Sequence, residues 1–414
     1  MKILAIHPQT KVLIENSSSE IKIFKKEQYF GKILKVVFNS GFGIKLLPSQ
    51  KLIDGELLRK KEVSEFKVGD FVLAPLDLKL HSINLKELEN ALKNKIKLIP
   101  ELGYIFGFLF GDGHIDRNEN RFYFTQSLKH KKYVEKLKKC WKKVTGTNLH
   151  EYIGKRIRKI EGRVITSPYI RLFRRNKKLI KLYDELIGSS LEKLIFLPEN
   201  VLKEFIAGIF DSDGCISIKK SGSLEAKFMI SNDIETNLNF MLALRRFGIY
   251  SKLFHSKDKV KRILIQNRKD IKILQNIISK YSEKIKGIKI PKRLKEVPSR
   301  SDRLPSSEIS KLCKKVLDDI KTKTALLNNC SGSSIYQYKN LKRIPYRDSL
   351  GRILVKLSPH LSIETRKEME KILRRDTFLD KIVKIKEDLY KGDICLLCIQ
   401  NNRNIILNGV FVCN

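Results

Sequence analysis

One pattern occurs twice in this chain: Ile105-Phe-Gly-Phe-Leu-Phe-Gly-Asp112-Gly113-His-Ile115, and later Ile206-Ala-Gly-Ile-Phe-Asp-Ser-Asp213-Gly214-Cys-Ile216. Each copy is a short apolar run that ends in an acidic residue followed by glycine. An internal repeat predicts two equivalent structural units within one fold. These two stretches therefore decide the architecture of the region around them.

Small residues recur four positions apart in both runs. On a helix this spacing places them along one face, where two backbones can approach closely. The residues predicted to pack the two helices in this way are Gly107, Gly111, Gly208 and Ser212. If the helices pack along these faces, Asp112 and Asp213 lie side by side at the helix C-termini.

Two carboxylates in this position repel each other and the partial negative charge of the helix C-termini. A divalent cation would turn this cost into a gain. Mg²⁺ typically takes one or two protein carboxylates and fills its shell with water and phosphate oxygens. The alternative is a buried helix whose Asp-Gly pair is only a C-terminal cap. Two copies in register favour a cation site at Asp112 and Asp213.

The chain is strongly basic. Its 414 residues include 84 Lys and Arg against 45 Asp and Glu, a net charge of +39 with a pI of about 9.9. Such an excess indicates a polyanionic partner, and we expect nucleic acid. The alternative is a Lys-rich thermostable surface, but such surfaces usually balance Lys with Glu.

Other signals narrow the class of protein further. The apolar run from Leu102 to Gly111 is too short to span a bilayer, and Met1 to Leu4 do not lead into a secretory signal. Seven scattered cysteines, an odd number, do not indicate a disulfide framework. We therefore expect a cytoplasmic protein without a membrane partner.

The residue patterns predict an α+β architecture in four segments. Residues 1–97 are typical of short strands separated by glycine and proline, one of which is predicted from Phe66 to Ala74. Residues 98–300 are predicted to form an α-β-β-α-β-β-α unit twice, over about 98–190 and 200–300. Residues 301–376 are predicted to be helical. Residues 377–414 return to strands, which are predicted at Ile382–Ile385, Ile394–Ile399, Ile405–Leu407 and Val410–Val412, with a turn at Asn408-Gly409. The first and last segments are expected to close one all-β domain around an insertion.

Two sets of residues are predicted to contact DNA. Basic residues on alternate strand positions would give a sheet one basic face that can lie along a groove; the candidates are Arg156, Arg158, Arg171 and Arg174. In the helical segment, a short helix with Gln337, followed by Lys339 and a basic turn, suits a recognition helix. The segment loosely resembles a lambda-repressor-like helix-turn-helix, and a plain helical spacer is the alternative.

The two repeats resemble the dodecapeptide motif of the LAGLIDADG (DOD-type) homing endonucleases. The flanks resemble an intein, because Ala5-Ile-His-Pro-Gln-Thr-Lys-Val12 is similar to its first block, and Phe378 to Ile385 and Asn408 to Asn414 are similar to its last blocks. The resemblance covers almost the whole chain. It implies an all-β Hint (intein-like) splicing domain that is split by an endonuclease.

The resemblance also implies an activity, the site-specific cleavage of both strands of DNA that serves intron homing. Asp112 and Asp213 match the family's metal-binding acids and would hold Mg²⁺, or Mn²⁺ in its place, against the scissile phosphates. Gln126 would be a polar residue near the attacking water. Lys219 and Lys227 are candidates for the cation that stabilises the transition state. Because the duplication supplies its own pseudo-two-fold, we expect a monomer.

The positions that serve protein splicing mostly fail to match. Ala5 replaces the nucleophile of the first block, and Gln50 replaces an expected His. Arg403 and Cys413 replace acid/base residues of the last blocks, and only Asn414 survives. We therefore expect that splicing has been lost.

Two alternative functions remain open at this point. The first is a self-splicing intein in a mutated form. The second is a DNA- or RNA-binding regulator, or an RNA maturase, that kept the fold and lost cleavage. This second alternative predicts that metal leaves the nucleic acid intact while binding persists.

Overall fold

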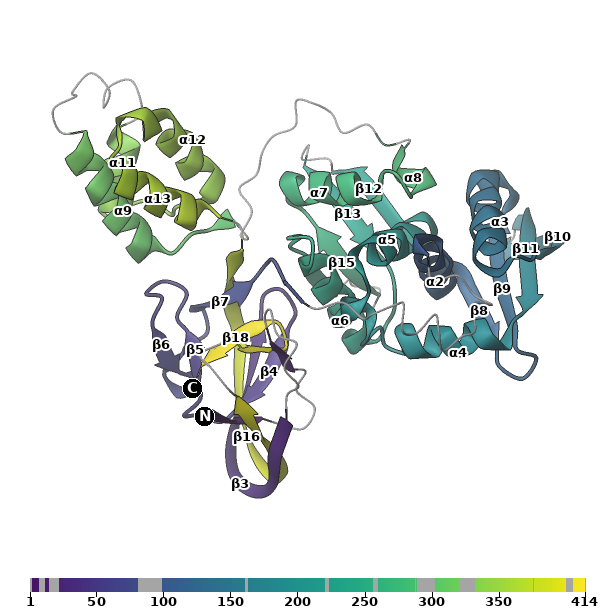
Figure 1. Ribbon diagram of the computed structural model, residues 1–414, viewed down its shortest axis with the longest axis horizontal. Helices are drawn as coiled ribbons and strands as arrows, with labels where there is room; N and C mark the ends of the chain where they lie inside the picture. The colour runs from purple at the N-terminus through teal and green to yellow at the C-terminus, as the bar shows by residue number, and fades with distance from the viewer. Residues whose placement is uncertain are drawn as a thin grey trace. The chain divides into compact units, whose positions relative to one another are not determined.

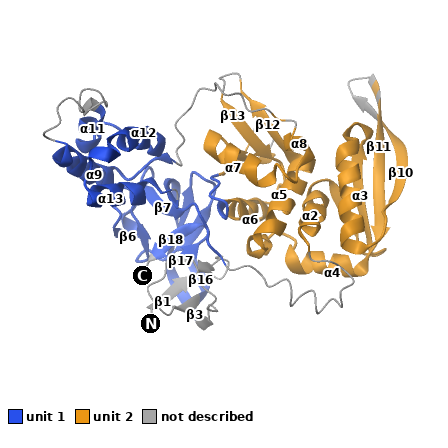
Figure 2. Ribbon diagram, turned by 45° about the horizontal axis from the view of Figure 1, so that its top comes forward, with its two compact units in different colours: residues 1–80, 245–250, 296–414 blue, residues 81–244, 251–295 orange. Residues whose placement is uncertain are grey.

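The computed structural model describes residues 2–6, 12–14, 22–80, 99–160, 163–219, 223–255, 260–286, 288, 302–320, 332–374, 376–399 and 405–413. The chain divides into two compact units, coloured in Figure 2. Unit 1 comprises residues 1–80, 245–250 and 296–414, and unit 2 comprises residues 81–244 and 251–295. The predicted helical segment thus falls into the same unit as both β segments.

Unit 2 contains the duplicated pattern as two runs of elements, most of which are labelled in Figure 1. The first run is α2 (Pro100–Asp112), β8 (Gly113–Asp116), β9 (Arg121–Ser127), α3 (Lys131–Thr145), β10 (His150–Ile160), β11 (Arg163–Arg175) and α4 (Lys177–Leu186). The second run is α5 (Glu199–Asp213), β12 (Gly214–Ile218), β13 (Leu224–Phe228), α6 (Ile234–Arg245), β14 (Lys252–His255), β15 (Lys261–Ile265) and α7 (Arg268–Ile278), with the short α8 (Glu283–Lys286) after it. Both runs have the predicted α-β-β-α-β-β-α order.

α2 and α5 pack side by side along their glycine-bearing faces (Figure 1). A Cβ atom on Gly107 would lie 2.0 Å from the carbonyl oxygen of Phe205, and one on Gly208 would lie 2.4 Å from that of Tyr104. No side chain larger than hydrogen fits at these distances unless the helices separate. Gly103, which sequence reasoning did not select, lies equally close to the backbone of α5. The contact brings the C-terminal ends of both helices together.

Each half of unit 2 has a four-stranded antiparallel sheet, in the orders β10-β11-β9-β8 and β12-β13-β15-β14. In the first sheet Phe122 and Phe124 of β9 are buried, and both rings meet Trp141 of α3 edge-on. Because side chains alternate across a strand, the other face of the sheet stays open. The two sheets differ in size, since β10 and β11 have 11 and 13 residues whereas β14 and β15 have 4 and 5.

Unit 1 joins strands from both ends of the chain into two sheets. In the first, β16 (Thr377–Ile399) pairs with β1 (Lys2–Ile6), β3 (Lys22–Phe38) and β7 (Phe71–Pro75), and β4 (Gly43–Leu46) pairs with β3. The second has the order β2 (Val12–Ile14), β17 (Ile405–Leu407), β18 (Val410–Cys413), β5 (Lys51–Ile53) and β6 (Lys60–Glu62). The expected pairing of the first and last segments is therefore observed. Asn408 and Gly409 have positive φ angles of 44° and 82°, which a tight two-residue hairpin turn requires.

The described part of the helical segment of unit 1 contains α9 (Ser306–Asp319), α11 (Gly332–Lys339), α12 (Arg347–Leu357) and α13 (Ile363–Leu373). These helices share a core that includes Ile309, Val316, Ile335 and Leu354. The segment contacts the β part of the unit through Glu56, whose carboxylate accepts hydrogen bonds from the Ser306 amide and from Arg303. None of the helices in the described ranges is both long and apolar enough to cross a bilayer.

Some strands differ from the sequence-based expectation. β16 is one continuous strand where two strands, Ile382–Ile385 and Ile394–Ile399, were expected. The charged stretch between them breaks the apolar alternation, but it pairs with β3 along its whole length, so backbone hydrogen bonds hold it in place. The predicted strand from Phe66 to Ala74 is shorter, because the chain turns at Gly69 (φ 109°) before β7 begins.

Replacing Gly107 or Gly208 by Ala is expected to destabilise unit 2 by about 1–3 kcal/mol each, because the added methyl group collides with the backbone of the facing helix. Chemical denaturation of the purified variants measures the change. Gly351→Ala in α12 is the control, because its Cβ would lie 3.7 Å from its nearest neighbour, an ordinary contact. If the three variants unfold at the same denaturant concentration, the close helix contact is not as described.

Candidate active site

The two acidic residues of the repeats lie beside each other where α2 and α5 end. A Cβ atom on Gly111 would lie 1.9 Å from Ser212 Oγ and 2.8 Å from Asp213 Oδ2, so the Asp213 carboxylate rests against the last turn of α2. Asp112 is the final residue of that turn. The structure therefore brings Asp112 and Asp213 together, as the packing argument anticipated.

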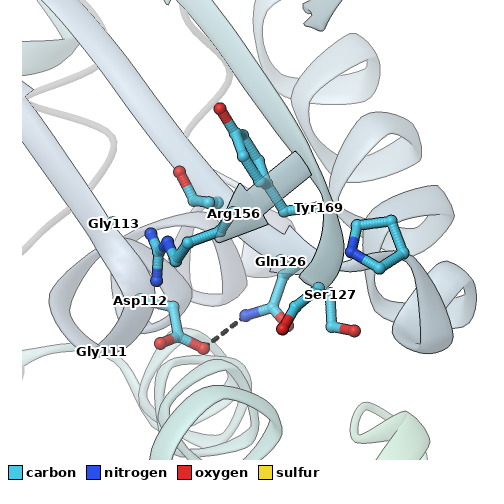
Figure 3. A pocket seen from close by; sticks show the side chains of 10 residues that line it. Gly111, Asp112, Gly113, Gln126, Ser127, Arg156 and Tyr169 are labelled. Atoms are coloured by element: carbon cyan, nitrogen blue, oxygen red, sulfur yellow. Dashed lines mark hydrogen bonds between the residues drawn. The ribbon is translucent and has the colours of Figure 1, made fainter. Parts of the chain in front are cut away.

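Gln126 lies beside Asp112. Gly113 is the cross-strand partner of Phe124, so the last part of β9 continues past the end of α2. There the Gln126 amide donates a hydrogen bond to Asp112 Oδ2, which Figure 3 shows as a dashed line. Both residues line a cavity of about 570 Å³, together with Thr125, Ser127, Arg156 and Tyr169. The cavity gives Asp112 access to a ligand from the open side of the first sheet.

Burial perturbs both carboxylates. Desolvation raises the pKa of Asp112, while the Gln126 hydrogen bond and the nearby Lys284 act in the opposite direction. Desolvation and the negative charge of Asp112 raise the pKa of Asp213 to about 6, and Lys284 again opposes the shift. Carboxylates held close together and partly out of water favour the binding of a cation.

Lys284 is a site residue that sequence reasoning missed. Its Nζ donates hydrogen bonds to the carbonyl oxygens of Ser212 (3.3 Å) and Gly214 (2.9 Å), on either side of Asp213. Desolvation lowers the pKa of Lys284, and the charges of Asp211, Asp112 and Asp213 oppose this shift. The only signal in the sequence is that Lys284 follows α7, the last helix of the second repeat; no local motif marks it.

The two lysines that were candidates for the transition-state cation lie in the sheet of the second half, where Lys227 is the cross-strand partner of Cys215. Lys219 and Lys227 both form ion pairs with the buried Glu225, at 3.1 Å for Lys227, and Gln266 donates to the same carboxylate at 2.7 Å. Their catalytic role stays a prediction. Lys284 is the lysine that the structure places against Asp213.

The two halves of the site are not equivalent. Gly113 pairs with Phe124 and Gly214 pairs with Phe228, which aligns the repeats residue by residue. Two positions after these phenylalanines stand Gln126 in the first half and Ile230 in the second. Asp213 therefore has no counterpart of the Gln126 hydrogen bond at this position, and Lys284 lies beside it instead.

The predicted DNA-binding arginines are distributed over both faces of the first sheet. Arg171 lies over the rings of Tyr169 and Tyr123, at 5.6 and 6.0 Å, and Arg156 lies over Tyr169 at 5.9 Å. These side chains share the open face. Arg174 has the opposite parity along β11, so alternation alone does not place it on the same face as Arg171. Its guanidinium group contacts His150 at 2.9 Å. The side chain of Arg158 is outside the described set. In α11, Gln337 is exposed and Lys339 is partly exposed.

The donor set at the helix ends fits a hard divalent cation. Among the residues that the structure describes, no cluster of three or more His, Cys, Asp or Glu is arranged to hold a metal. Mg²⁺ does not require one, because one or two carboxylates with water and phosphate oxygens complete its shell. Asp112 and Asp213 supply the carboxylates, and the cavity beside Asp112 leaves space for the remaining oxygen ligands.

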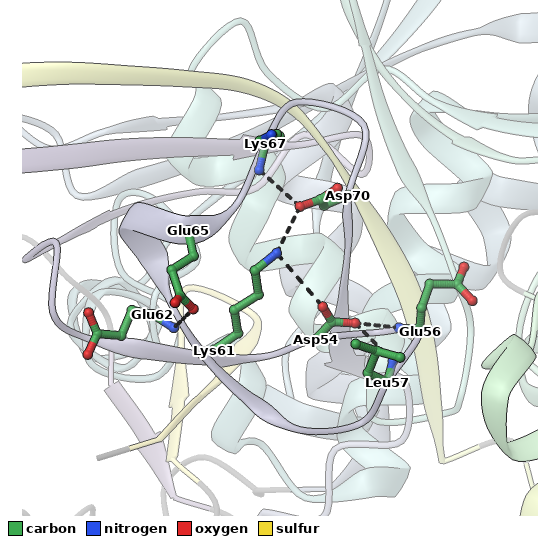
Figure 4. A network of polar contacts seen from close by, with 8 residues as sticks. All are labelled: Asp54, Glu56, Leu57, Lys61, Glu62, Glu65, Lys67 and Asp70. Atoms are coloured by element: carbon green, nitrogen blue, oxygen red, sulfur yellow. Dashed lines mark hydrogen bonds and ion pairs between the residues drawn. The ribbon is translucent and has the colours of Figure 1, made fainter.

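A second group of carboxylates lies in unit 1, where Asp54 and Asp70 share the ammonium group of Lys61 (Figure 4). Lys61 Nζ lies 3.2 Å from Asp70 and 4.0 Å from Asp54. Asp54 also accepts hydrogen bonds from the amides of Glu56 and Leu57, both at 2.9 Å, and Asp70 accepts one from the Lys67 amide at 3.0 Å. This network holds the β5–β6 turn, so it is structural.

For most of the predicted splicing positions, the side chain is outside the part of the chain that the structure describes. Arg403 and Asn414 are outside the described residues, and of Ala5 and Cys413 only the backbone is described, in β1 and β18. Gln50 is buried, and its side-chain oxygen accepts a hydrogen bond from the Leu47 amide at 2.8 Å. The loss of splicing stays a prediction.

Comparison with known proteins gives one sequence family and several relatives. Residues 200–279 match the family described as the LAGLIDADG-like domain. Reverse gyrase of Methanocaldococcus jannaschii is 26% identical over 324 residues, 76% of this chain and 18% of that protein. The ATP-dependent DNA helicase Hel308 of the same organism is 30% identical over 256 residues, 58% of this chain and 18% of that protein. The chain thus spans less than a fifth of the length of these relatives.

Among solved structures, the homing endonuclease I-WcaI bound to its DNA recognition sequence aligns with a TM-score of 0.35 and 17% identity, over 48% of this chain and 88% of that chain. The family match begins in α5 and ends just after α7, so it contains Asp213 and the second repeat. Residues 200–279 of this chain are therefore a LAGLIDADG-like domain.

Proposed function

We propose that this protein is a site-specific, double-strand DNA endonuclease of the homing type that depends on Mg²⁺, with Mn²⁺ as a substitute. The observation that carries the proposal is the meeting of Asp112 and Asp213 at the ends of two packed helices. Each acid comes from one of two repeats, so the site has the pseudo-two-fold that two antiparallel DNA strands require. A monomer is sufficient for this arrangement.

The roles of the residues follow from their positions. Asp112 and Asp213 would hold Mg²⁺, which when bound supplies charge that stabilises the phosphate and activates a water molecule. Gln126, hydrogen-bonded to Asp112, orients that carboxylate and presents its amide to the cavity where water enters. Lys284 brings a positive charge next to Asp213 and would stabilise the negative charge that grows on the phosphate. This arrangement supports phosphodiester hydrolysis.

The charge and shape of the first sheet support a DNA partner. Its open face carries Arg156 and Arg171 stacked on tyrosine rings, next to the cavity at Asp112. Guanidinium groups bind phosphates and guanine edges, and rings beneath them limit their motion. The net charge of +39 adds a strong, salt-dependent attraction to any polyanion. Gln337 and Lys339 on α11 are proposed as a second contact with DNA.

The relatives support an intein-derived scaffold. Reverse gyrase and the Hel308 helicase have different names and activities, yet each shares with this chain a segment that is 18% of its own length. A segment common to otherwise different proteins is what the insertion of an intein would produce. We therefore include in the proposal that unit 1 is a Hint scaffold whose splicing residues have been lost.

Asp112→Asn and Asp213→Asn are each expected to reduce cleavage by at least about a hundredfold, because each removes a carboxylate ligand while keeping the shape of the side chain. The measurement starts from a plasmid library with random inserts, incubated with Mg²⁺ and sequenced at the cut ends, which supplies the substrate. Cleavage rates of this substrate then compare the variants with wild type. Both variants should keep wild-type affinity for DNA in a gel-shift assay.

Asp184→Asn is the matched control, because this carboxylate lies on the surface of α4 and pairs with Arg117 at 2.8 Å. It should cleave at the wild-type rate. Wild-type protein that binds DNA but leaves every library member intact with Mg²⁺ and with Mn²⁺ would instead support a cleavage-dead regulator or maturase.

Mg²⁺ affinity is expected to weaken as the pH falls through about 6. The pKa of Asp213 is raised to about 6, so below this pH the carboxyl group is protonated and neutral, and it cannot serve as a ligand. Isothermal titration calorimetry of the DNA-free protein between pH 5 and 8 measures this. In Asp213→Asn the step near pH 6 should disappear; a step of unchanged size in that variant would contradict the assignment.

A further inference from the structure

Asp211, two residues before Asp213, is almost fully buried, with 1% of its surface exposed. Its carboxylate accepts four hydrogen bonds. Oδ2 accepts from the Tyr104 hydroxyl at 2.9 Å and the Glu283 amide at 3.0 Å. Oδ1 accepts from the Lys284 amide at 3.0 Å and from the Ser282 hydroxyl. A carboxylate has about four acceptor sites, so this side chain is saturated by its neighbours.

Hydrogen bonds hold both the backbone and the side-chain ammonium group of Lys284 at the C-terminal end of α5. Asp211 holds the backbone amide of Lys284, while the ammonium group binds the carbonyl oxygens of Ser212 and Gly214. The peptide that carries Lys284 is thus fixed to the same helix that carries Asp213. Without Asp211, the segment 282–284 loses three of its contacts with α5, and the backbone from which the Lys284 side chain extends is held only through the contacts of its ammonium group with Ser212 and Gly214.

The first repeat has no buried carboxylate at the position that corresponds to Asp211. Gly107 aligns with Gly208 and Asp112 aligns with Asp213, which places Phe110 opposite Asp211. A phenyl ring cannot accept hydrogen bonds from backbone amides. The group that donates a hydrogen bond to Asp112 is Gln126, from β9. The two acids are therefore supported by different side chains from different elements.

We propose that Asp211 is a positioning residue that holds Lys284 beside Asp213, and that the two DNA strands consequently depend on it unequally. The inference rests on the proposed endonuclease function. The strand cut through Asp213 and Lys284 requires Asp211, whereas the strand cut through Asp112 and Gln126 does not. Loss of Asp211 converts a double-strand endonuclease into an enzyme that mainly nicks.

Asp211→Asn tests the proposal. The amide keeps the shape of the side chain but replaces one acceptor oxygen by an NH2 donor, which then faces one backbone amide and one hydroxyl. With a supercoiled plasmid that carries a site selected from the random library, we expect nicked circles to accumulate. Cleavage of one strand should slow by about 10- to 100-fold, since small displacements of a catalytic group have effects of this size. Cleavage of the other strand should stay within about twofold of wild type. Strand-specific end labels give both rates.

Glu204→Gln is the matched control, because Glu204 is a buried carboxylate on the same helix and has no hydrogen bond to residues 282–284 among the described contacts. It should leave the ratio of the two rates unchanged. In a Lys284→Met background, Asp211→Asn should add no further loss if it acts through the lysine. Equal slowing of both strands, or full additivity with Lys284→Met, would overturn the proposal.

Amide hydrogen exchange, measured by mass spectrometry on the free protein without metal or DNA, separates this inference from the proposed function. Asp211→Asn should speed exchange at Glu283 and Lys284 by roughly tenfold or more, and Glu204→Gln should not. Unchanged exchange in Asp211→Asn would overturn the positioning role even if cleavage is absent for other reasons. If Asp211→Asn does not fold, Ser282→Ala removes one donor to the same carboxylate and must show the same strand bias; equal rates on both strands would then refute the proposal.

Discussion

The structure of unit 2 depends on the direct contact between the backbones of α2 and α5. Because Gly103, Gly107 and Gly208 have no side chains, the peptide groups of one helix rest on those of the other. Such a contact tolerates almost no change in the distance between the helices. It also fixes where both helices end, and so where Asp112 and Asp213 lie. One packing interaction thus determines both the fold of the duplicated region and the geometry of its acidic pair.

The side chains that surround the two acids differ between the repeats. The helices, their order and their acids repeat, but Gln126 has Ile230 as its counterpart, and Asp211 has Phe110. Burial disfavours the charged form of both carboxylates. The positive charge of Lys284 opposes this at both, and the Gln126 amide adds a hydrogen bond at Asp112 alone. The backbone contact keeps glycine at the aligned positions Gly107 and Gly208, where the two helices cross. Side chains that only need to lie near a carboxylate are free to differ.

The sequence predicted the features that follow from local patterns. The repeated apolar runs gave two helices, the order of elements in both repeats was confirmed, and the helix-packing argument anticipated the meeting of Asp112 and Asp213. Lys284 could not be found in this way, because its place beside Asp213 results from a tertiary contact with Asp211 and no short motif encodes it. The continuity of β16 depends on its partner β3, which no pattern within β16 reveals.

The unequal lengths of the outer hairpins have a consequence for recognition. At about 3.3 Å per residue, β11 extends over roughly 40 Å and β15 over roughly 15 Å. Under the proposed endonuclease function, a duplex that lies across both sheets would be contacted much farther from its midpoint on the β11 side. Base changes at the outer positions of that arm would then weaken recognition most, while the opposite arm would tolerate them. Sequence drift in a target would then accumulate on one side of its centre.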